Sequence, residues 1–305
     1  MQNLSWVYMI QYKKFLIPVD FSDYSAYAVK QGLSLAQMYQ AAVYFLHVGG
    51  NAQRAATRLS SFIRHRIGFE LPVPVKKIVA QGHPPSTILS AARKIRADAI
   101  VMGSRGVSGL KQLVQGSVAE KVLRHADRPV FIIKQRKRVD TGEYMFPQIR
   151  NIEDVFQADK ILVPLDFSPA SKDALHHAVS IATRYNSTIY TLTIFDKKLK
   201  EYGDDHEKHT SVIVRGEKIQ LWKEFPLLFE EMGCDPSRIR LRRMLLSGDP
   251  FSKIESVAEN KEVDLVVMGT NGKSGLGYFL LGSVAEKVLR TLDCSVMTIR
   301  SHENE

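Results

Sequence analysis

The chain has 305 residues, an ordinary apolar share of 45% and a formal net charge of +10. This length fits two domains of about 150 residues each, and no stretch approaches the roughly 18 uninterrupted apolar residues of a membrane span. The first residues lack an apolar stretch followed by a small-residue cleavage site, so we expect a cytoplasmic protein. Cys234 and Cys294 have no partners at metal-ligand spacing, so neither zinc nor a structural disulfide is expected.

The positive charge is compatible with nucleic acid, an acidic membrane surface or anionic small ligands as partners. Its densest run, residues 134–138, follows the last predicted strand of the first half, and we interpret it as part of a solvated linker. No basic helix interleaved with aromatic residues and no zinc-finger or RNP pattern is present. Nucleic-acid binding therefore ranks last among the functions considered.

In chain order, the first half predicts short apolar strands near residues 15–19, 42–48, 75–80, 99–102 and 130–133, with amphipathic helices between them. In the second half, Ser168 followed by Pro169 predicts a helix start, and residues 175, 178, 179 and 182 form its apolar stripe. Such alternation predicts an α/β fold with a parallel sheet and helices on both faces. Ligands of these sheets bind at the carboxyl ends of the strands, after strands one and four here.

An internal repeat divides the chain. Residues 16–22 (LIPVDFS) recur as 162–168 (LVPLDFS), and the nine residues 116–124 recur identically as 282–290. We therefore expect tandem domains at 9–135 and 159–302, joined by a linker at 136–158. The second copy carries about 20 extra residues between Ile194 and Gly248, and its charged part, 201–209, predicts a loop or helix start beside the ligand pocket.

A glycine pattern, G-x2-G-x9-G-S, follows strand four in both copies, from Gly103 to Ser117 and from Gly269 to Ser283. Glycine permits positive φ and close approach of an anion, and the amides that open the following helix favour phosphate. Ser117-x-x-Glu120 and Ser283-x-x-Glu286 also match a capping box. The alternative interpretation is ordinary turn glycines followed by a helix cap.

An aspartate ends strand one in each copy, as Asp20 and Asp166. Its carboxylate is placed to accept a hydrogen bond from an adenine amino group or a ribose hydroxyl. The alternative is that it caps the helix that follows.

These residues resemble the universal stress protein family, over about 15–134 and 159–300. The resemblance implies two Rossmann-like domains, each a five-stranded parallel sheet of order 3-2-1-4-5, that bind ATP or ADP, with or without Mg²⁺ and without a protein-held metal. It also implies that strand five of each domain, 129–134 and 295–300, pairs within the chain as a pseudo-dimer, with a further homodimer as an option. The alternative is that Lys134 and Arg300 protect these edges by charge alone.

The resemblance assigns adenosine to the strand-one aspartates, the adenine edge to the ends of strand two, and the phosphates to the loop glycines and serines. In the first domain the expected ATP-binding residues are Pro18, Val19, Asp20, Val48, Met102, Gly103, Ser104, Arg105, Gly106, Gly116, Ser117 and Val118. In the second domain they are Pro164, Leu165, Asp166, Ile194, Met268, Gly269, Thr270, Asn271, Gly272, Gly282, Ser283 and Val284.

No Walker A motif, G-x-S-x-G elbow or kinase signature is present, and no general base accompanies the loop. The leading hypothesis is an ATP-binding regulatory or stress-response module with at most slow hydrolysis and no catalytic residues, acting on unknown protein partners. The alternatives are a true ATPase or phosphotransferase, and an interaction scaffold that binds no nucleotide.

Overall fold

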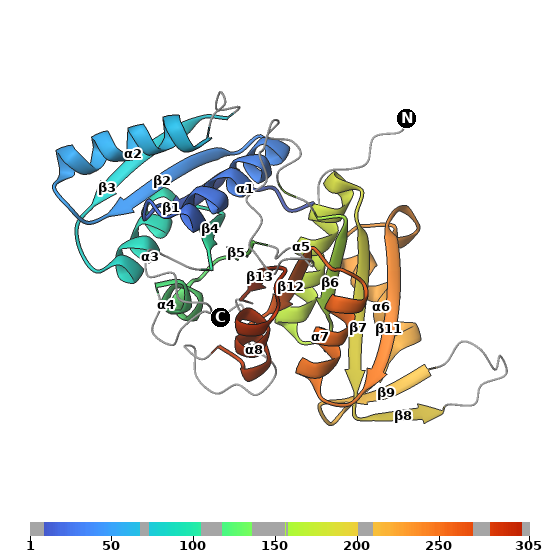
Figure 1. The fold of residues 1–305 in the computed structure, drawn as a ribbon. Coiled ribbons are helices and arrows are strands. Elements are labelled where there is room, and N and C mark those ends of the chain that lie inside the picture. Colours follow the sequence, from blue (N-terminus) through green and yellow to red (C-terminus); the bar gives the residue numbers. More distant parts are fainter. Residues whose placement is uncertain are drawn as a thin grey trace.

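The computed structural model describes residues 9–67, 73–104, 118–135, 156, 158–200, 210–270 and 281–300. Strands and helices alternate along the first half (Figure 1). Its elements are β1 (Lys14–Pro18), α1 (Asp23–Tyr39), β2 (Ala42–Val48), α2 (Ala52–Ile67), β3 (Val75–Ala80), α3 (Pro84–Ile95), β4 (Ala99–Gly103), α4 (Val118–His125) and β5 (Val130–Ile133). The strands predicted from apolar runs are therefore present, with ends that differ by at most one residue.

The second half repeats this order and adds a short antiparallel sheet. Its elements are β6 (Lys160–Pro164), α5 (Pro169–Tyr185), β7 (Thr188–Phe195), β8 (Lys197–Lys200), β9 (Thr210–Val214), β10 (Glu217–Gln220), α6 (Leu221–Glu231), the 3-10 turn Pro236–Arg238, β11 (Arg240–Ser247), α7 (Pro250–Asn260), β12 (Leu265–Gly269), α8 (Ser283–Thr291) and β13 (Ser295–Ile299). The extra residues of the second copy thus supply β8, β9 and β10. The stretch 201–209, for which a loop or helix start was predicted, lies outside the described residues.

Ten strands form one sheet in the order β11-β7-β6-β12-β13-β5-β4-β1-β2-β3. The five strands that each half contributes to this sheet, numbered along the chain, lie in the order 3-2-1-4-5. All five are parallel within each half. The predicted fold class is therefore confirmed. The strand order changes direction between strands one and four of each copy, which is where α/β sheets bind ligands.

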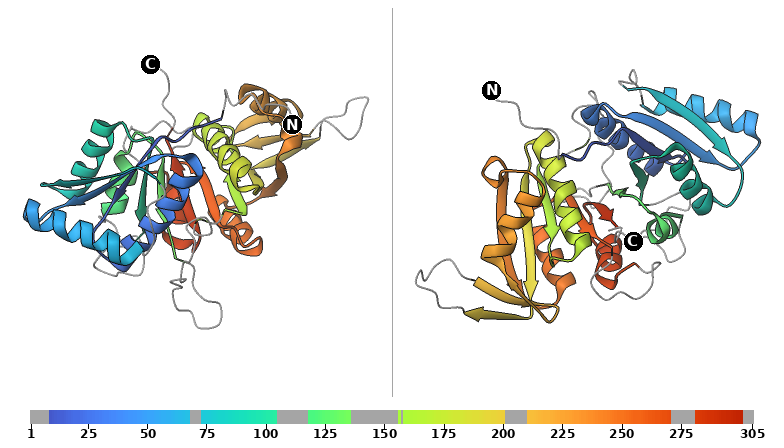
Figure 2. Two further views of the ribbon diagram at one scale, coloured as in Figure 1. Left: turned by 90° about the horizontal axis from the view of Figure 1, so that it is seen from above. Right: turned by 180° about the vertical axis from the view of Figure 1, so that it is seen from behind.

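Helices cover both faces of this sheet, and the views in Figure 2 show them wrapped around both halves. One core layer collects apolar side chains under α1, α2, α5 and α6, and the other collects those under α3, α4, α7 and α8. Both layers run through the two halves without interruption, because strands from each half contribute to each layer. Burial of this continuous apolar area is the main force that holds the halves together.

The helix after strand one begins at the predicted signal in both copies. Ser22 and Ser168 are the N-caps of α1 and α5, and their hydroxyls accept hydrogen bonds from the backbone N–H of Ser25 and Ser171. Pro169 occupies the first turn of α5, where its missing N–H costs nothing. The predicted apolar stripe of α5 is buried.

The halves meet where β5 pairs antiparallel with β13, with Ile132 opposite Val296 and Val130 opposite Thr298. Lys134 and Arg300, which follow these strands, do more than protect edges by charge. The Lys134 ammonium donates to the carbonyl of Leu292 at the end of α8, and the Arg300 guanidinium donates to the carbonyls of Arg124 (3.0 Å) and Ala126 (3.5 Å) at the end of α4. Each cation therefore satisfies helix-terminal carbonyls of the opposite half.

The identical segments of the two copies also meet at this junction. Arg124 of α4 lies 2.8 Å from Glu120 and 3.5 Å from Glu286 of α8. Arg290 of α8 lies 2.8 Å from Glu286 and 3.8 Å from Glu120. The two glutamates and two arginines thus form a reciprocal network across the junction. The sequence did not predict that its two identical segments contact each other.

The segments that precede strand one cross between the halves as well. The hydroxyl of Ser180 in α5 donates to the carbonyl of Ile10, while the hydroxyl of Ser34 in α1 accepts from the N–H of Phe156. Ile10 and Phe156 are 146 positions apart, as are Ser34 and Ser180, and the same offset separates the two copies of strand one. None of the described helices is long and apolar enough to cross a membrane.

Candidate nucleotide site

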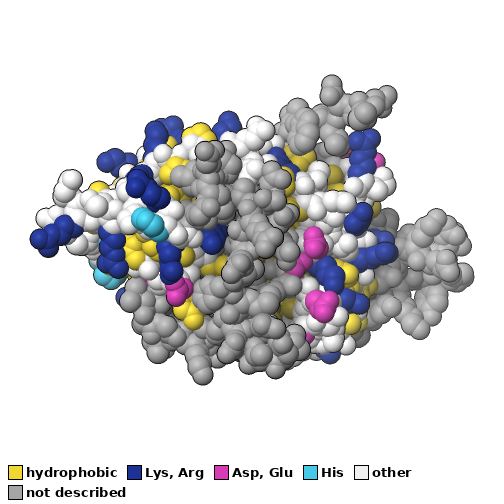
Figure 3. All heavy atoms as spheres, turned by 45° about the horizontal axis from the view of Figure 1, so that its top comes forward, with side chains coloured by type: hydrophobic (Ala, Val, Ile, Leu, Met, Phe, Trp, Pro, Cys, Tyr) yellow, Lys and Arg dark blue, Asp and Glu magenta, His cyan; other side chains and the backbone are white. Residues whose placement is uncertain are grey.

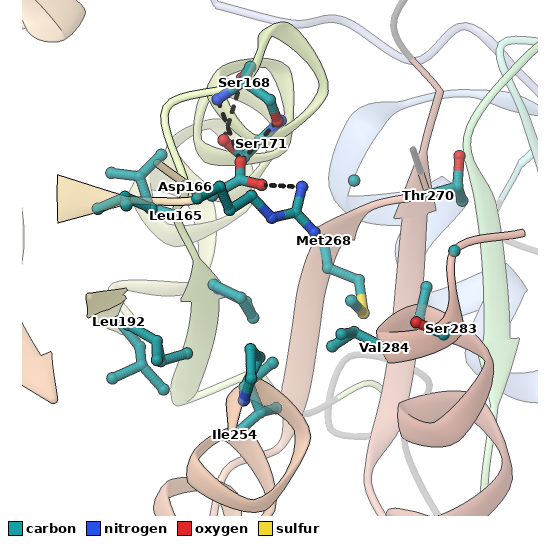
Figure 4. Close-up of a pocket in the computed structure, with 18 of the residues that line it drawn as sticks. Leu165, Asp166, Ser168, Ser171, Leu192, Ile254, Met268, Thr270, Ser283 and Val284 are labelled. Carbon is teal, nitrogen blue, oxygen red and sulfur yellow. Dashed lines mark hydrogen bonds and ion pairs between the residues drawn. The ribbon is translucent and has the colours of Figure 1, made fainter. Parts of the chain in front are cut away.

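A cavity of about 210 Å³ opens at the carboxyl ends of β6 and β12 in the second half (Figure 4). Both strands point into it, and α5, α7 and α8 close its sides. Ten of the twelve residues expected at the second ATP site line it: Pro164, Leu165, Asp166, Ile194, Met268, Gly269, Thr270, Gly282, Ser283 and Val284. The other two, Asn271 and Gly272, lie outside the described residues.

The apolar part of this cavity is built by side chains from β7, α7, β12 and α8 and by the residue that follows β6. Leu165, Leu192, Ile254, Met268 and Val284 are labelled around it in Figure 4, and the first four of these are buried. The strand ends and helices α7 and α8 thus make an apolar surface that can hold a flat apolar group.

Asp166 is held by the turn that follows β6. Its Oδ1 accepts hydrogen bonds from the N–H (3.1 Å) and the hydroxyl (2.6 Å) of Ser168. The residue between them, Phe167, adopts a φ of 61°, which a side chain of this size rarely tolerates. Asp166 therefore braces the cap serine and the strained turn rather than capping the helix itself.

The charge state of Asp166 follows from its neighbours. Partial burial raises the pKa of this carboxyl, but hydrogen bonds from Ser168 and Ser171 and the positive charge of Arg215 outweigh burial, so the net shift is downward. Asp166 is therefore an anion at neutral pH, with Oδ1 committed to the turn and Oδ2 facing the cavity side.

The two ends of the glycine loop meet at its base. The N–H of Gly282 donates to the carbonyl of Thr270 (2.9 Å), and the N–H of Thr270 donates to Ile299 on β13 (2.9 Å). A Cβ on Gly282 would lie 3.0 Å from the Thr270 carbonyl oxygen, so this position requires glycine for close approach. The hydroxyl of Thr270, expected to donate to a ligand, donates to the carbonyl of Ile299 (3.3 Å).

Helix α8 begins differently from the sequence prediction. Its N-cap is Gly282, at φ −60° and ψ 146°, and no side chain caps it, so the capping box assigned to Ser283 and Glu286 is wrong. Ser283 is the first helical residue and its side chain is exposed at the cavity. Without a capping side chain, the first N–H groups of α8 are left for another acceptor, as an anion site requires.

Gly269 is required for packing rather than for backbone freedom. A Cβ there would lie 2.8 Å from the Cβ of Ala170 and 3.0 Å from its carbonyl carbon. Neither Gly269 nor Gly282 has a positive φ, so the predicted use of positive φ is wrong at these two positions.

Arg215 is a charged cavity residue that the sequence did not predict. It lies in the tight turn between β9 and β10, where Arg215 and Gly216 have φ values of 52° and 81°. Two positive values in a two-residue connection are typical of a type I′ hairpin. Its guanidinium Nη1 lies 2.7 Å from Oδ2 of Asp166. The run of three β-branched residues at 212–214, followed directly by Arg-Gly, was a usable signal for a strand that ends in a turn.

The first copy repeats the same turn chemistry. Oδ1 of Asp20 accepts from the N–H (3.0 Å) and hydroxyl (2.6 Å) of Ser22, and Phe21 has a φ of 69°. Pro18, Val19, Val48, Met102, Gly103, Ser104 and Val118 lie at the strand and helix ends predicted for them. The expected residues Arg105, Gly106, Gly116 and Ser117 lie outside the described part of the chain.

The described cysteines and acidic residues give no metal centre. Cys234 is partly exposed and Cys294 is buried, and the two do not form a disulfide. Within the described ranges, no three His, Cys, Asp or Glu side chains gather closely enough to hold a metal ion.

Comparison with known proteins agrees with this architecture. The model of the universal stress protein family matches residues 11–134 and 157–300. A curated universal stress protein from Methanocaldococcus jannaschii, MJ0531, is 32% identical over 159 residues, which cover 52% of this chain and 89% of that protein. A universal stress protein from Mycolicibacterium smegmatis is 22% identical over 315 residues, covering 93% of this chain and 96% of that protein.

Among solved structures, a universal stress protein from Archaeoglobus fulgidus superposes with a TM-score of 0.65 at 21% identity, covering 97% of this chain and 99% of that one. At this identity the likeness concerns the fold, whereas the family match rests on the two copies of the sequence model. The paired strand order, the duplicated Asp-Phe-Ser turn and the duplicated family match lead to one conclusion: the chain belongs to the universal stress protein family.

Proposed function

We propose that the second copy binds ATP or ADP in the cavity between β6 and β12, and that the protein is a nucleotide-dependent regulatory module. One observation carries this proposal: ten of the residues that the family resemblance assigned to the second ATP site line a single cavity. Apolar walls from Leu165, Leu192 and Met268 suit an adenine ring. The uncapped start of α8 suits phosphates.

The orientation of the ligand follows from these two ends. Phosphates at the Gly282–Ser283 end leave the rest of the cavity, which Asp166 and Ile194 also line, for the nucleoside. The carboxylate of Asp166 then accepts from a ribose hydroxyl, as acidic residues do in dinucleotide-binding sheets. The first copy is proposed to use Asp20, Val48 and Gly103 in the same manner.

Slow hydrolysis at most is part of the proposal. The described cavity residues include two carboxylates, and both are engaged: Asp166 contacts Ser168 and Arg215, and Oδ2 of Asp196 accepts from the N–H of Gly216 (3.2 Å). Efficient phosphoryl transfer needs a group that positions the attacking nucleophile. Turnover well above about 0.1 per second, against about 1–100 per second for kinases, would instead establish an ATPase or phosphotransferase.

We further infer that the junction through β5 and β13 acts within one chain as the subunit contact acts in single-domain members, with domains at 9–135 and 159–302. The reciprocal bonds of Lys134 and Arg300 support this pseudo-dimer.

The positive charge of the chain is spread over the surface: on the face seen in Figure 3, Lys and Arg side chains occur over both halves of the protein. We attribute them to solvation and phosphate attraction, and binding of nucleic acid would instead appear as steep salt dependence.

The test is direct extraction of the purified protein followed by identification of any released nucleotide, together with calorimetric titration of ATP. The expected result is bound ATP or ADP, and its loss in the double variant Gly116→Val with Gly282→Val; the valine at 282 would collide with the Thr270 carbonyl. Gly116→Val makes the matched change in the first copy. A folded protein that releases no nucleotide and shows no ATP-induced melting shift would support the alternative of a scaffold without nucleotide.

A further inference from the structure

We propose that Arg215 makes the second cavity selective for phosphorylated nucleosides over uncharged ones, because ligand binding moves its guanidinium from Asp166 to a phosphate. This inference rests on the proposed nucleotide site and concerns how that site chooses its ligand. It gives a function to the β8–β10 insertion, for which the first copy has no counterpart.

The insertion holds Arg215 in place over the cavity. Val214, just before it, is buried, and the hairpin turn is fixed by the bond from the N–H of Gly216 to Asp196 and by the bond from the N–H of Asp196 to the carbonyl of Ile213 (2.7 Å). The backbone at Arg215 is therefore tethered to the end of β7. Its side chain is 44% exposed and has a long flexible stem, so its tip can turn while the hairpin stays in place.

The carboxylate of Asp166 is already well supplied with donors. Ser168 provides two to Oδ1, at 2.6 and 3.1 Å, the side chain of Ser171 adds another hydrogen bond, and Arg215 provides one to Oδ2 at 2.7 Å. The Ser168 bonds hold the strained turn at Phe167 and cannot be released without disturbing it. A ribose hydroxyl that approaches Asp166 must therefore compete with Arg215, the one charged donor in this set.

The cost of that competition depends on the ligand. Adenosine would break the ion pair and leave Arg215 without an anion, whereas ATP carries its own replacement anions. Arg215 is also the only Lys or Arg among the described residues that line the cavity, and the same residues include the carboxylates of Asp166 and Asp196. A guanidinium in that position lowers the repulsion between these carboxylates and the phosphates.

The first copy lacks this arrangement. Its chain passes from Val48 through Gly49 and Gly50 directly into α2, where the second copy has Phe195, Asp196 and the insertion. The selectivity assigned to Arg215 is thus a property of the second cavity alone, and its effects should be seen only in segments around that cavity.

The experiment titrates the full-length protein with adenosine and with ATP and follows hydrogen exchange in segments 160–171 and 281–291, which report on the second cavity only. Arg215→Gln removes the charge, Arg215→Lys keeps it without the guanidinium fork, and Arg238→Met is the matched control, since Arg238 pairs with Asp235 away from the cavity. Thermal melting checks that every variant is folded.

In Arg215→Gln we expect opposite changes for the two ligands. Because the phosphate loses its guanidinium partner, the affinity for ATP should fall by about tenfold. Because the competing ion pair with Asp166 is lost, the affinity for adenosine should rise by about fivefold, since partly exposed ion pairs contribute up to about 1 kcal/mol. Arg215→Lys should retain part of the wild-type preference, and Arg238→Met all of it.

Two results would overturn the inference separately from the proposed function. If wild type binds ATP but Arg215→Gln leaves both affinities unchanged, or weakens both ligands equally, Arg215 is a structural residue only. If neither ligand slows hydrogen exchange in either segment of the wild-type protein, the proposed nucleotide site is wrong and the inference is wrong with it.

Discussion

Glu120 of the first half and Arg290 of the second lie 3.8 Å apart, in a network that Arg124 and Glu286 complete from the opposite sides. The two glutamates occupy equivalent places in identical segments, yet they differ in exposure: the side chain of Glu120 is 7% exposed and that of Glu286 is 32% exposed. Identical sequence therefore gives unequal environments, and the two copies provide matched variants.

Replacement of Glu120 should cost more stability than the same replacement of Glu286. Glu120→Gln removes the buried carboxylate and leaves Glu286 as the remaining carboxylate of the network for both Arg124 and Arg290, so we expect a loss of about 1–3 kcal/mol in the free energy of unfolding. Glu286→Gln removes a more exposed charge and should cost less than about 1 kcal/mol. Urea unfolding measures both. Equal losses for the two variants would contradict the asymmetric network.

The cation that ends each strand five should stabilise the junction. Arg300→Met removes the donors to the carbonyls of Arg124 and Ala126, and we expect a loss of about 1–2 kcal/mol in the free energy of unfolding. Lys134→Met removes the equivalent donor to Leu292 and should act in the same direction. Lys253→Met, at α7 rather than at the junction, serves as the control. Unchanged unfolding midpoints for both junction variants would show that these bonds contribute nothing.

Acid should weaken the contact between the N-terminal segment and α5. Burial lowers the pKa of His177 to about 3, with a further contribution from His176, and its Nδ1 lies 2.5 Å from the hydroxyl of Tyr12. The unfolded chain binds a proton at His177 near the ordinary pKa of about 6.5. Between these values the unfolded state holds more protons, so stability falls as pH decreases, by up to about 1.4 kcal/mol per pH unit.

Thermal or urea unfolding between pH 7 and pH 4 tests this dependence. His177→Gln should flatten it, and glutamine is a natural choice because Gln31 is the buried residue at the matching position of α1. His83→Gln, at the exposed start of α3, is the control and should leave the slope unchanged. An identical slope in wild type and His177→Gln would mean that His177 does not titrate in this range.

Alanine substitutions at two glycines of the second loop should affect different properties, one folding stability and the other nucleotide binding. Gly269→Ala places a Cβ 2.8 Å from that of Ala170, so we expect a loss of about 1–3 kcal/mol in stability from overpacking. Gly282→Ala instead presses on the Thr270 carbonyl at the loop base, so it should weaken nucleotide binding with a smaller effect on folding. Calorimetry and urea unfolding separate the two effects.

The double variant Gly269→Ala with Ala170→Gly provides the check on the packing argument. Removal of the Ala170 methyl group should restore part of the lost stability, because that group is the nearest atom to the added Cβ. If the double variant is no more stable than Gly269→Ala alone, the close contact with Ala170 is not the reason for glycine at this position.

The sequence by itself determined the fold of each half. Short apolar runs that alternate with amphipathic helices fix strand and helix positions locally, and the repeat showed that the pattern occurs twice. It also predicted which residues of the second half line the cavity at the carboxyl ends of the strands, since strand ends and the loops that follow them converge there by topology alone. The Ser22 and Ser168 caps were readable because capping depends on neighbouring residues only.

Only the tertiary structure decided where separate segments touch. The pairing of Arg215 with Asp166, the network of Glu120 with Arg290, and the contact of Gly269 with Ala170 each join residues far apart in the chain. The sequence pattern suggested positive φ at the loop glycines and a cap at Ser283, but packing against neighbouring backbone gave those glycines another role. Local sequence encodes local geometry, whereas close approach and charge pairing depend on how the two halves and the insertion pack in space.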